Sequence, residues 1–491
     1  MLLEVTAFVC GMAIMVIELL GARMISPFFG NSFYIWTGVI GVVLVSMTLG
    51  YWRGGILADR SKGLRSLSEK IFIAGVTTII LPLLVTFFGG LGFFFGMQWG
   101  AVITSVFSLS IPCYFLAMVS PYCIRLSPKD HENIGAVSGR LYSISTLGSI
   151  FGVFMSGFIL LPYFKVRVTL YILGVALVLL SVGLYLKGSA HSKLDVAQVA
   201  VMSVSSLAFI ILQLVYLPPF IPDLRGTNQT ILRTDETKYN SIAVVETSIG
   251  SERYRLMSLG SLVQGGIEVS SNTSYYRYAD YLEYMWAVNP DIHDVLIMGN
   301  GAAVLVGKIR AEHPEVMVDV VDIDPVVFEY ASEYFGERED SHTRFIVDDA
   351  RMYLKGTNKK YDLIVMDIFG ATHVIPFHIA TVEMLDSVSS HLNPKGAYFL
   401  NLVSSIEGPR SILFKSELKT FGEVFPQNYV VQVKGKDAVD TVLLISGGQD
   451  YPGERLRSID NLTGRLFESS HYDLSDGIIL TDEYAPVEAM L

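Results

Sequence analysis

Residues 295–324 read VLIMGNGAAVLVGKIRAEHPEVMVDVVDID, and this stretch decides the fold of the second half of the chain. It opens with a short apolar run, 295–298, of the kind that forms a buried parallel strand. A glycine turn follows, then a helix expected over 302–311 and a second apolar strand over 316–321. A strand, a helix and a parallel strand in this order form the unit from which doubly wound α/β folds are built.

Three residues within this stretch suggest what the unit binds. Gly299 and Gly301 allow a sharp turn and a close approach of the backbone to a ligand. Asp322 stands at the carboxyl end of the second strand, where doubly wound folds place a carboxylate that binds ribose hydroxyls. The turn therefore predicts a nucleoside site, and an ordinary strand-to-helix turn with a helix-capping Asp fits the same residues.

The rest of the second half repeats this alternation. Helical stretches alternate with apolar strands at VLIMG, VMVDVVD, TRFIVDD, YDLIVMD and AYFLNLV, which predicts a mainly parallel sheet with helices on both faces. Before them, SIAVVET, RYRLMSLG and SLVQGG indicate a small antiparallel sheet. We therefore expect a Rossmann-like, methyltransferase-type α/β domain over 280–491, preceded by a linker and a small β-strand domain over 218–279.

The first half of the chain is far more apolar. Of the 491 residues 51% are hydrophobic, and the mean hydropathy of +0.46 is too high for an ordinary soluble protein. The first apolar stretch is expected to remain as a helix, because it lacks the basic start of a cleavable signal and contains Glu18 and Arg23. We predict a seven-helix transmembrane domain over 1–217, with spans at 4–26, 33–57, 71–90, 98–120, 141–163, 168–186 and 196–217.

Charge predicts the orientation of these spans. Residues 1–217 hold 13 Lys and Arg and 7 Asp and Glu, a net charge of +6, whereas 218–491 hold 23 and 40, a net charge of −17. Basic residues cluster after the second, fourth and sixth spans, which indicates cytoplasmic connections, with Lys165 and Arg167 after the fifth span as contrary evidence. A cytoplasmic amino terminus and seven crossings of the cell membrane would place the acidic domain outside. An acidic domain repels nucleic acid and favours cationic small molecules.

Several residues within the spans suggest roles in packing, and one of them also suggests a role in function. Glu18 fits either pairing on its own helix or a substrate path through the membrane. Gly148 and Gly152 are spaced for close helix packing. The three cysteines lie in or beside apolar spans, which suits packing and provides neither a metal cluster nor a disulfide framework: Cys10, Cys113 and Cys123.

Carboxylates follow one strand after another in the second half. They are Asp322 and Asp324, Asp348 and Asp349, and Asp367. The carboxyl ends of parallel strands form the ligand crevice of an open sheet, so these side chains should converge there. Strand ends in this order and spacing resemble those of the polyamine aminopropyltransferases, the spermidine synthase family, over residues 235–445.

The resemblance implies a nucleoside pocket with named residues. Gly299 and Gly301 would form the turn around the nucleoside, and Asp322 would bind the ribose hydroxyls. Asp349, followed by Ala350, matches the family carboxylate that accepts a hydrogen bond from the adenine amine.

The resemblance also implies a site for the amine that attacks. Asp367 matches the first Asp of the family's D-S-S-D loop, which takes the proton from the attacking amine. Asn240 and Gln264 fall at two Gln positions of the family that contact the donor, and Tyr278 and Asp280 match the aromatic and acidic residues of the amine tunnel.

Two further candidate residues, and two differences from the family's sequence motifs, complete the expected site. His378, in the loop after Asp367, is a candidate for substrate contact or an ordinary loop residue. Asp482 is a further candidate for contact with the amine. The family's G-G-G-D-G reads GNGAA here, so Ala302 replaces the carboxylate that holds the donor's ammonium. The D-S-S-D loop reads DIFG, so Gly370 replaces the second carboxylate that binds the acceptor amine.

The first half carries a second resemblance. The segments ELLGARMISPFFGNSFYIWTGVIGVVLVSMTLGYWRGGILADR and GRLYSISTLGSIFG look like the amino-terminal part of membrane-fused spermidine synthase homologues. Together with LTDEYAPVEAML near the end, they extend the resemblance over most of the chain.

The resemblance implies transfer of an aminopropyl group from decarboxylated S-adenosylmethionine to an amine such as putrescine, with release of 5′-methylthioadenosine. The donor is a co-substrate, and no metal or permanently bound cofactor is expected. A methyltransferase that uses S-adenosylmethionine, and a transporter or sensor that binds polyamine or nucleoside, are the alternatives. The lipid bilayer and a small amine are the expected partners, and the oligomeric state, including a homodimer, stays open.

Overall fold

The computed structural model describes residues 1–29, 33–61, 63–127, 134–188, 229–260, 262–370, 375–408, 410–433, 441–462 and 464–490. The chain divides into two compact units. The first is Met1–Phe220 with Glu236–Asn240, and the second is Ile221–Asp235 with Ser241–Leu491.

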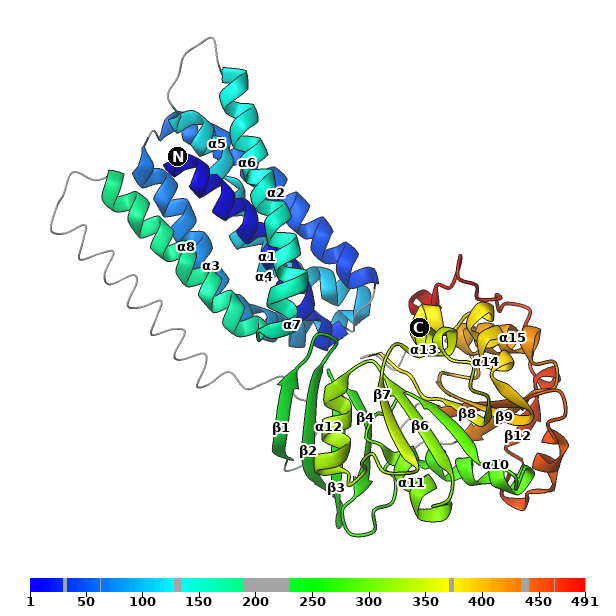
Figure 1. Ribbon diagram of the computed structural model, residues 1–491. Helices are drawn as coiled ribbons and strands as arrows, with labels where there is room; N and C mark the ends of the chain where they lie inside the picture. The colour runs from blue at the N-terminus through cyan, green and yellow to red at the C-terminus, as the bar shows by residue number, and fades with distance from the viewer. Residues whose placement is uncertain are drawn as a thin grey trace. The chain divides into compact units, whose positions relative to one another are not determined.

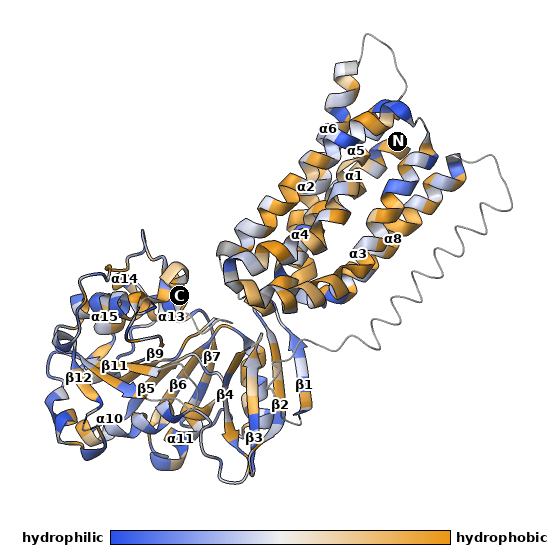
Figure 2. Ribbon diagram, turned by 180° about the vertical axis from the view of Figure 1, so that it is seen from behind, coloured by the Kyte–Doolittle hydropathy of each residue, from blue (hydrophilic) through white to orange (hydrophobic). Residues whose placement is uncertain are grey.

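The first unit is a bundle of apolar helices (Figure 1). Its elements are α1 (Leu2–Phe29), α2 (Phe33–Arg60), α3 (Leu64–Gly92), η1 (Phe93–Phe95), α4 (Gly96–Ala117), α5 (Val119–Leu126), α6 (Ile134–Met155), η3 (Ser156–Leu160), α7 (Leu161–Tyr163) and α8 (Val166–Gly188). Figure 2 shows hydrophobic residues along the length of these helices. The described residues contain six helices long and apolar enough to cross a membrane: Leu2–Phe29, Ile35–Arg60, Leu64–Gly92, Gln98–Leu126, Gly135–Tyr163 and Val166–Gly188.

The first six predicted spans each fall on one of these helices. The seventh, 196–217, lies outside the described residues, as does the start of the predicted linker after it, 218–228. The three cysteines are buried, as their apolar surroundings predicted, and they are free. Asp59 at the end of α2 pairs with Arg125 at the end of α5, at 2.8 Å between Oδ1 and Nε.

Small residues let α6 approach α1 closely. A Cβ atom placed on Gly148 would lie 2.1 Å from the carbonyl oxygen of Phe8, and one on Gly152 would lie 2.6 Å from that of Met12. Both distances are far shorter than a van der Waals contact, so only glycine fits at these two positions. This geometry agrees with the prediction that the two glycines allow close packing of helices.

The second unit begins with a four-stranded sheet in the order β1-β2-β3-β4. Its strands are β1 (Gln229–Glu236), β2 (Ser241–Ile249), β3 (Glu252–Leu259) and β4 (Leu262–Glu268). The pairs β2–β3 and β3–β4 are antiparallel. The three segments expected to be strands are β2, β3 and β4, whereas β1 was not predicted.

An eight-stranded mixed sheet follows, in the order β12-β10-β11-β9-β8-β5-β6-β7 (Figure 1). The strands are β5 (Asp294–Met298), β6 (Met317–Asp322), β7 (Thr343–Val347), β8 (Tyr361–Met366), β9 (Leu392–Val403), β10 (Tyr429–Val433), β11 (Thr441–Gly447) and β12 (Leu466–Glu468). The pairs β7–β6, β6–β5, β5–β8 and β8–β9 are parallel, and the pairs β9–β11, β11–β10 and β10–β12 are antiparallel. The order of the parallel strands reverses between β5 and β8, which defines a topological switch point.

Helices cover both faces of this sheet. They are η4 (Arg277–Leu282), α10 (Glu283–Val288), α11 (Val304–Glu312), α12 (Pro325–Tyr334), α13 (Ala350–Gly356), η5 (Phe377–Ile379), α14 (Val382–Ser390) and α15 (Ile412–Val424). Shorter 3-10 turns follow: η6 (Gly453–Ser458), η7 (Asp460–Leu462), η8 (Ser469–His471) and η9 (Val487–Met490). Alternate residues of β5 enter different cores: Val295 and Ile297 pack with α10 and α11, whereas Leu296 and Met298 pack with α14 and α15. Burial on both faces explains why the parallel strands are almost continuously apolar.

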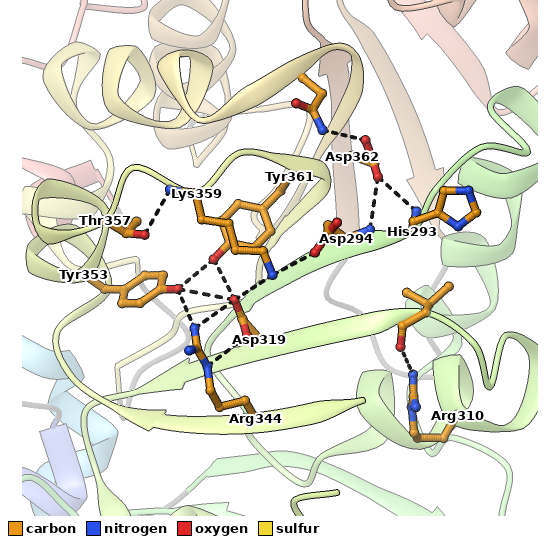
Figure 3. Close-up of polar contacts among 12 residues, drawn as sticks. His293, Asp294, Arg310, Asp319, Arg344, Tyr353, Thr357, Lys359, Tyr361 and Asp362 are labelled. Carbon is orange, nitrogen blue, oxygen red and sulfur yellow. Dashed lines mark hydrogen bonds and ion pairs between the residues drawn. The ribbon is translucent and has the colours of Figure 1, made fainter. Parts of the chain in front are cut away.

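A polar network joins four strands in the first half of their length (Figure 3). The buried carboxylate of Asp319 in β6 accepts a hydrogen bond from the hydroxyl of Tyr361 at 2.8 Å. It also pairs with Arg344 of β7 at 3.1 Å and with Lys359 at 3.2 Å. Lys359 in turn pairs with Asp294 at the start of β5. This network fixes neighbouring strands far from their carboxyl ends and leaves those ends free to form a site.

Candidate active site

The carboxyl ends of β5 and β8 meet at the switch point. The amide of Asp367, just after β8, donates to the carbonyl of Met298 at 2.8 Å, and the amide of Gly299 donates to the carbonyl of Val321. Gly299 has a φ of +92°, and a Cβ atom there would lie 2.2 Å from the carbonyl oxygen of Asp367. The turn therefore requires glycine at this position, because the backbone that follows β8 occupies the space of a side chain.

The helix after this turn begins later than the sequence predicts. Gly301 has a φ of +49° and Ala303 a φ of +55°, and α11 starts at Val304. A residue in the left-handed region cannot continue into a right-handed helix, so the turn is two residues longer than expected. Ala303 is a non-glycine residue in this region, which strains the backbone at the switch point.

Asp322 closes the turn from the side of β6. Its Oδ2 atom accepts a hydrogen bond from the amide of Asn300 at 2.9 Å, and its Oδ1 atom accepts one from the amide of Asp324 at 2.9 Å. Burial raises the pKa of Asp322 to about 6, although these hydrogen bonds oppose the shift. Each carboxylate oxygen can accept a second hydrogen bond, so the side chain can still bind a diol.

Asp349 lies at the next strand end, after β7. It caps α13, because its Oδ1 atom accepts hydrogen bonds from the amides of Arg351 and Met352, both at 3.0 Å. Its Oδ2 atom lies 3.4 Å from Nε2 of His378. The buried Ala350 is the first residue of α13. The structure thus brings His378 to the carboxylate that the resemblance assigns to adenine.

Asp367 is held at both of its oxygens. The hydroxyl of Tyr278 in η4 donates to Oδ2 at 2.5 Å, and Nδ2 of Asn401 in β9 donates to Oδ1 at 2.8 Å. Burial raises the pKa of Asp367, and the two hydrogen bonds act against that shift. A carboxylate with a raised pKa is a better proton acceptor than an exposed one.

Asn401 is a site residue that sequence reasoning missed. It is 3% exposed in the middle of the apolar run AYFLNLV. A single amide in a buried strand is the signal that could have identified it, since a buried polar side chain needs a partner.

Gln264 of β4 lies near the loop after β8. Its Nε2 atom donates to the carbonyl of Gly370 at 3.4 Å. Gly370 is the last described residue of this part of the loop, and His373, the other histidine of the loop, lies outside the described residues.

The contacts of three further expected residues leave their roles untested. Asp280 is exposed on η4. Asp482 pairs with both Nη atoms of Arg351, at 2.6 Å and 2.5 Å, and accepts a hydrogen bond from Thr381 at 2.9 Å. Asn240 belongs to the segment Glu236–Asn240 of the first unit, where its amide donates to Oγ1 of Thr237. Their roles as substrate or donor contacts stay predictions.

The arrangement places the three predicted carboxylates at the ends of three parallel strands. Asp322 and Asp349 end neighbouring strands, and Asp367 ends the strand across the switch point. Among the described residues no three His, Cys, Asp or Glu side chains gather as a metal site.

Comparison with known proteins places this geometry in context. Residues 283–434 match the Spermine/spermidine synthase domain. The polyamine aminopropyltransferase of Vibrio vulnificus is 27% identical over 285 residues, which cover 53% of this chain and 91% of that protein. An eEF1A lysine and N-terminal methyltransferase homolog of Drosophila melanogaster is 24% identical over 166 residues, covering 32% of this chain and 24% of that protein. A probable spermidine synthase from Corynebacterium glutamicum is a similar solved structure, with a TM-score of 0.38 and 21% identity, covering 44% of this chain and 79% of that chain.

Proposed function

With a spermine/spermidine synthase domain over residues 283–434, as the strand-end carboxylates predicted, we propose that this chain is a membrane-fused polyamine aminopropyltransferase. It transfers an aminopropyl group from decarboxylated S-adenosylmethionine to an amine such as putrescine and releases 5′-methylthioadenosine. The similarity to the Vibrio vulnificus enzyme supports this activity. The six apolar helices support attachment to a cell membrane.

The observation that carries the proposal is the placement of Asp367. It lies at the switch point, where open α/β sheets bind their ligands, and it contacts Tyr278 and Asn401 from two other elements. In aminopropyl transfer the nitrogen of a neutral amine forms a bond to the carbon next to the sulfonium. The bond from that carbon to sulfur breaks, and sulfur leaves as a neutral thioether. The nitrogen becomes positively charged and loses a proton, which Asp367 accepts.

The other residues of the site bind and orient the substrates. Asp322 is proposed to bind the ribose hydroxyls and Asp349 the adenine amine. Gln264, Tyr278 and His378 are proposed to line the path of the amine and the donor. Holding the two reactants in line supplies much of the rate in reactions of this kind, so residues that only bind are expected to affect turnover.

The activity is tested with the purified full chain in detergent. Decarboxylated S-adenosylmethionine and putrescine should yield spermidine and 5′-methylthioadenosine, both detected by mass spectrometry. The substitution Asp367→Asn should lower the rate by about a hundredfold to ten-thousandfold, the usual loss when a general base is removed. The control is Asp386→Asn, because Asp386 is exposed on α14. An Asp367→Asn protein that reacts at the wild-type rate at every pH would exclude Asp367 as the proton acceptor.

A methyltransferase is the second candidate, and Ala302 favours it. Without a carboxylate at this position, nothing charged in the GNGAA turn selects a donor that lacks its carboxyl group. The Drosophila methyltransferase homolog matches 32% of this chain. Incubation with S-adenosylmethionine labelled at its methyl group distinguishes the two activities, since only a methyltransferase passes the label to an acceptor.

A further inference from the structure

The side-chain amide of Asn300 is buried at the switch point without a partner. Asn300 is 6% exposed, and neither its Oδ1 nor its Nδ2 atom has a hydrogen-bond partner among the described residues. Buried polar side chains in folded proteins nearly always form hydrogen bonds, so an amide without one needs an explanation. At a ligand crevice, the natural explanation is that the ligand supplies the partner.

Backbone contacts fix the position of Asn300 in the turn, which lies against both Asp322 and Asp367. The backbone N–H of Asn300 donates a hydrogen bond to the carboxylate of Asp322. The backbone carbonyl of Asn300 accepts a hydrogen bond from the backbone N–H of Ala303 at 2.8 Å. The preceding residue, Gly299, touches the backbone of Asp367. Asn300 therefore lies in the turn that connects the proposed ribose carboxylate with the proposed proton acceptor.

Ala302 does not take over the role of the missing carboxylate. It is 3% exposed and belongs to an apolar cluster with Ile242, Val244 and Met257. Its Cβ atom lies 3.2 Å from where a Cβ on Gly265 would stand. Its methyl group provides no hydrogen-bonding atom for the donor's ammonium.

The side-chain amide of Asn401, at the same crevice, also has an oxygen atom without a hydrogen-bond partner among the described residues. Oδ1 of Asn401 is buried and has no partner in the part of the chain that the structure describes, while its Nδ2 atom holds Asp367. An ammonium group has three hydrogen-bond donors and no acceptor, so unpaired amide oxygens suit it.

We propose that Asn300 is the residue that binds the tail of the donor, with its Oδ1 atom accepting a hydrogen bond from the ammonium of that tail. This inference rests on the proposed aminopropyl transfer and names the residue that binds the donor's tail in that site. A neutral amide does not repel a carboxylate, and its Nδ2 atom can donate to one. The wild-type protein therefore discriminates only weakly between decarboxylated S-adenosylmethionine and S-adenosylmethionine.

Three ligands and two variants test the inference. The affinities of decarboxylated S-adenosylmethionine, S-adenosylmethionine and 5′-methylthioadenosine are measured by calorimetry with the full chain in detergent. The third ligand carries a methyl group in place of the tail, so it reports on the nucleoside pocket alone. Asn300→Ala should weaken the decarboxylated donor by about tenfold to a hundredfold, as expected for a hydrogen bond to a charged group, and change the affinity for 5′-methylthioadenosine by less than about twofold. Asn300→Asp should raise the preference for the decarboxylated donor at least about tenfold, because a carboxylate attracts the ammonium and repels the carboxylate.

A matched control separates binding of the donor's tail from folding. Asn428 is also buried with an unpartnered Oδ1 atom, but it lies just before β10, away from the crevice. Asn428→Ala should leave all three affinities unchanged.

Two results would overturn the inference while the proposed function stands. One is an Asn300→Ala protein that binds the decarboxylated donor as tightly as the wild type. The other is a uniform loss for all three ligands, which would assign Asn300 to the shape of the turn. A wild-type protein that binds none of the three would overturn the proposed function itself.

Discussion

At the scale of single residues, the site depends on buried carboxylates whose protonation differs from that of exposed ones. Burial raises the pKa of Asp322 to about 6 in the free protein. In its proposed role, the side chain must be ionised to accept hydrogen bonds from ribose hydroxyls at both oxygens. Ligand binding therefore favours the ionised form and becomes weaker wherever the free protein is protonated.

This linkage predicts the pH dependence of nucleoside binding. The affinity for 5′-methylthioadenosine should be constant well above pH 6 and fall by about tenfold for each pH unit below it, as expected for the loss of one proton on binding. Calorimetry between pH 5 and pH 8 measures the effect. The variant Asp322→Asn should bind more weakly and lose the pH dependence in this range, because an amide does not titrate. An unchanged pH profile in the variant would contradict the assignment of Asp322.

A second buried carboxyl affects stability, away from the site. Glu417 on α15 is 3% exposed, its Oε1 atom has no hydrogen-bond partner among the described residues, and burial raises its pKa to about 8. The corresponding pKa in an unfolded chain is about 4.3. Between these two values the unfolded state loses the proton and the folded state keeps it. The free energy of unfolding therefore falls as the pH rises from about 4.3 to 8.

Replacing this carboxyl should remove the effect. At pH 8 we expect the Glu417→Gln protein to unfold at a higher temperature than the wild type, with a free energy of unfolding larger by roughly 1 to 3 kcal/mol. At pH 5 the difference in the free energy of unfolding should be smaller. Scanning calorimetry of the full chain at both pH values measures the difference. Equal shifts at pH 5 and pH 8 would show that the carboxyl is not buried in its neutral form.

At the scale of elements, sequence patterns predict the strands that are buried on both faces of the sheet. The apolar runs of β5, β6 and β8 were predicted because helices cover them on either side. The polar strand β1 and the three-residue edge strand β12 gave no such signal. The start of α11 was placed too early, because the left-handed conformation of Ala303 depends on how the turn packs and not on its composition.

The same distinction holds for the candidate site. Asp322, Asp349 and Asp367 could be predicted because a strand end is visible in the sequence, and topology brings strand ends together. The proposed role of Asn300 and the contact of Asn401 could not be predicted in this way, since an amide in a turn or a strand does not indicate its partner. Tertiary contacts, such as that between Asn401 and Asp367, are what reveal them.

Helix packing in the first unit gives a prediction at the same scale. A Cβ atom on Gly148 would lie 2.1 Å from the backbone of α1, whereas one on Gly139, in the same helix, would meet nothing within 4 Å. Gly148→Ala should therefore lower the thermal stability of the full chain in detergent, by about 1 to 3 kcal/mol if the backbones move apart. Gly139→Ala is the matched control and should be neutral or slightly stabilising, since alanine favours helices. Equal stability of the two variants would contradict the close contact between α1 and α6.

At the scale of the whole molecule, the division between an apolar, basic half and an acidic half raises the question of sidedness. The count of basic residues favours a cytoplasmic amino terminus, and seven crossings would then place residues 218–491 outside the cell. Donors of the S-adenosylmethionine type are made in the cytoplasm. An outside domain would therefore need a donor that crosses the membrane, which would give the helices a role in transport.

The cysteines of this chain make the orientation measurable. All three native cysteines are buried in the first unit, so a maleimide that cannot cross membranes should report mainly on a cysteine introduced at the surface. Ser270 is exposed after β4, and Ser61 is exposed after α2 in a connection expected to be cytoplasmic. If the charge count holds, Ser270→Cys is labelled in intact spheroplasts and Ser61→Cys only after permeabilisation. Protection of both residues in intact spheroplasts would place the enzyme domain in the cytoplasm, where its donor is made. An even number of crossings would then separate Ser270 from the amino terminus, so one of the seven predicted spans would not cross the membrane.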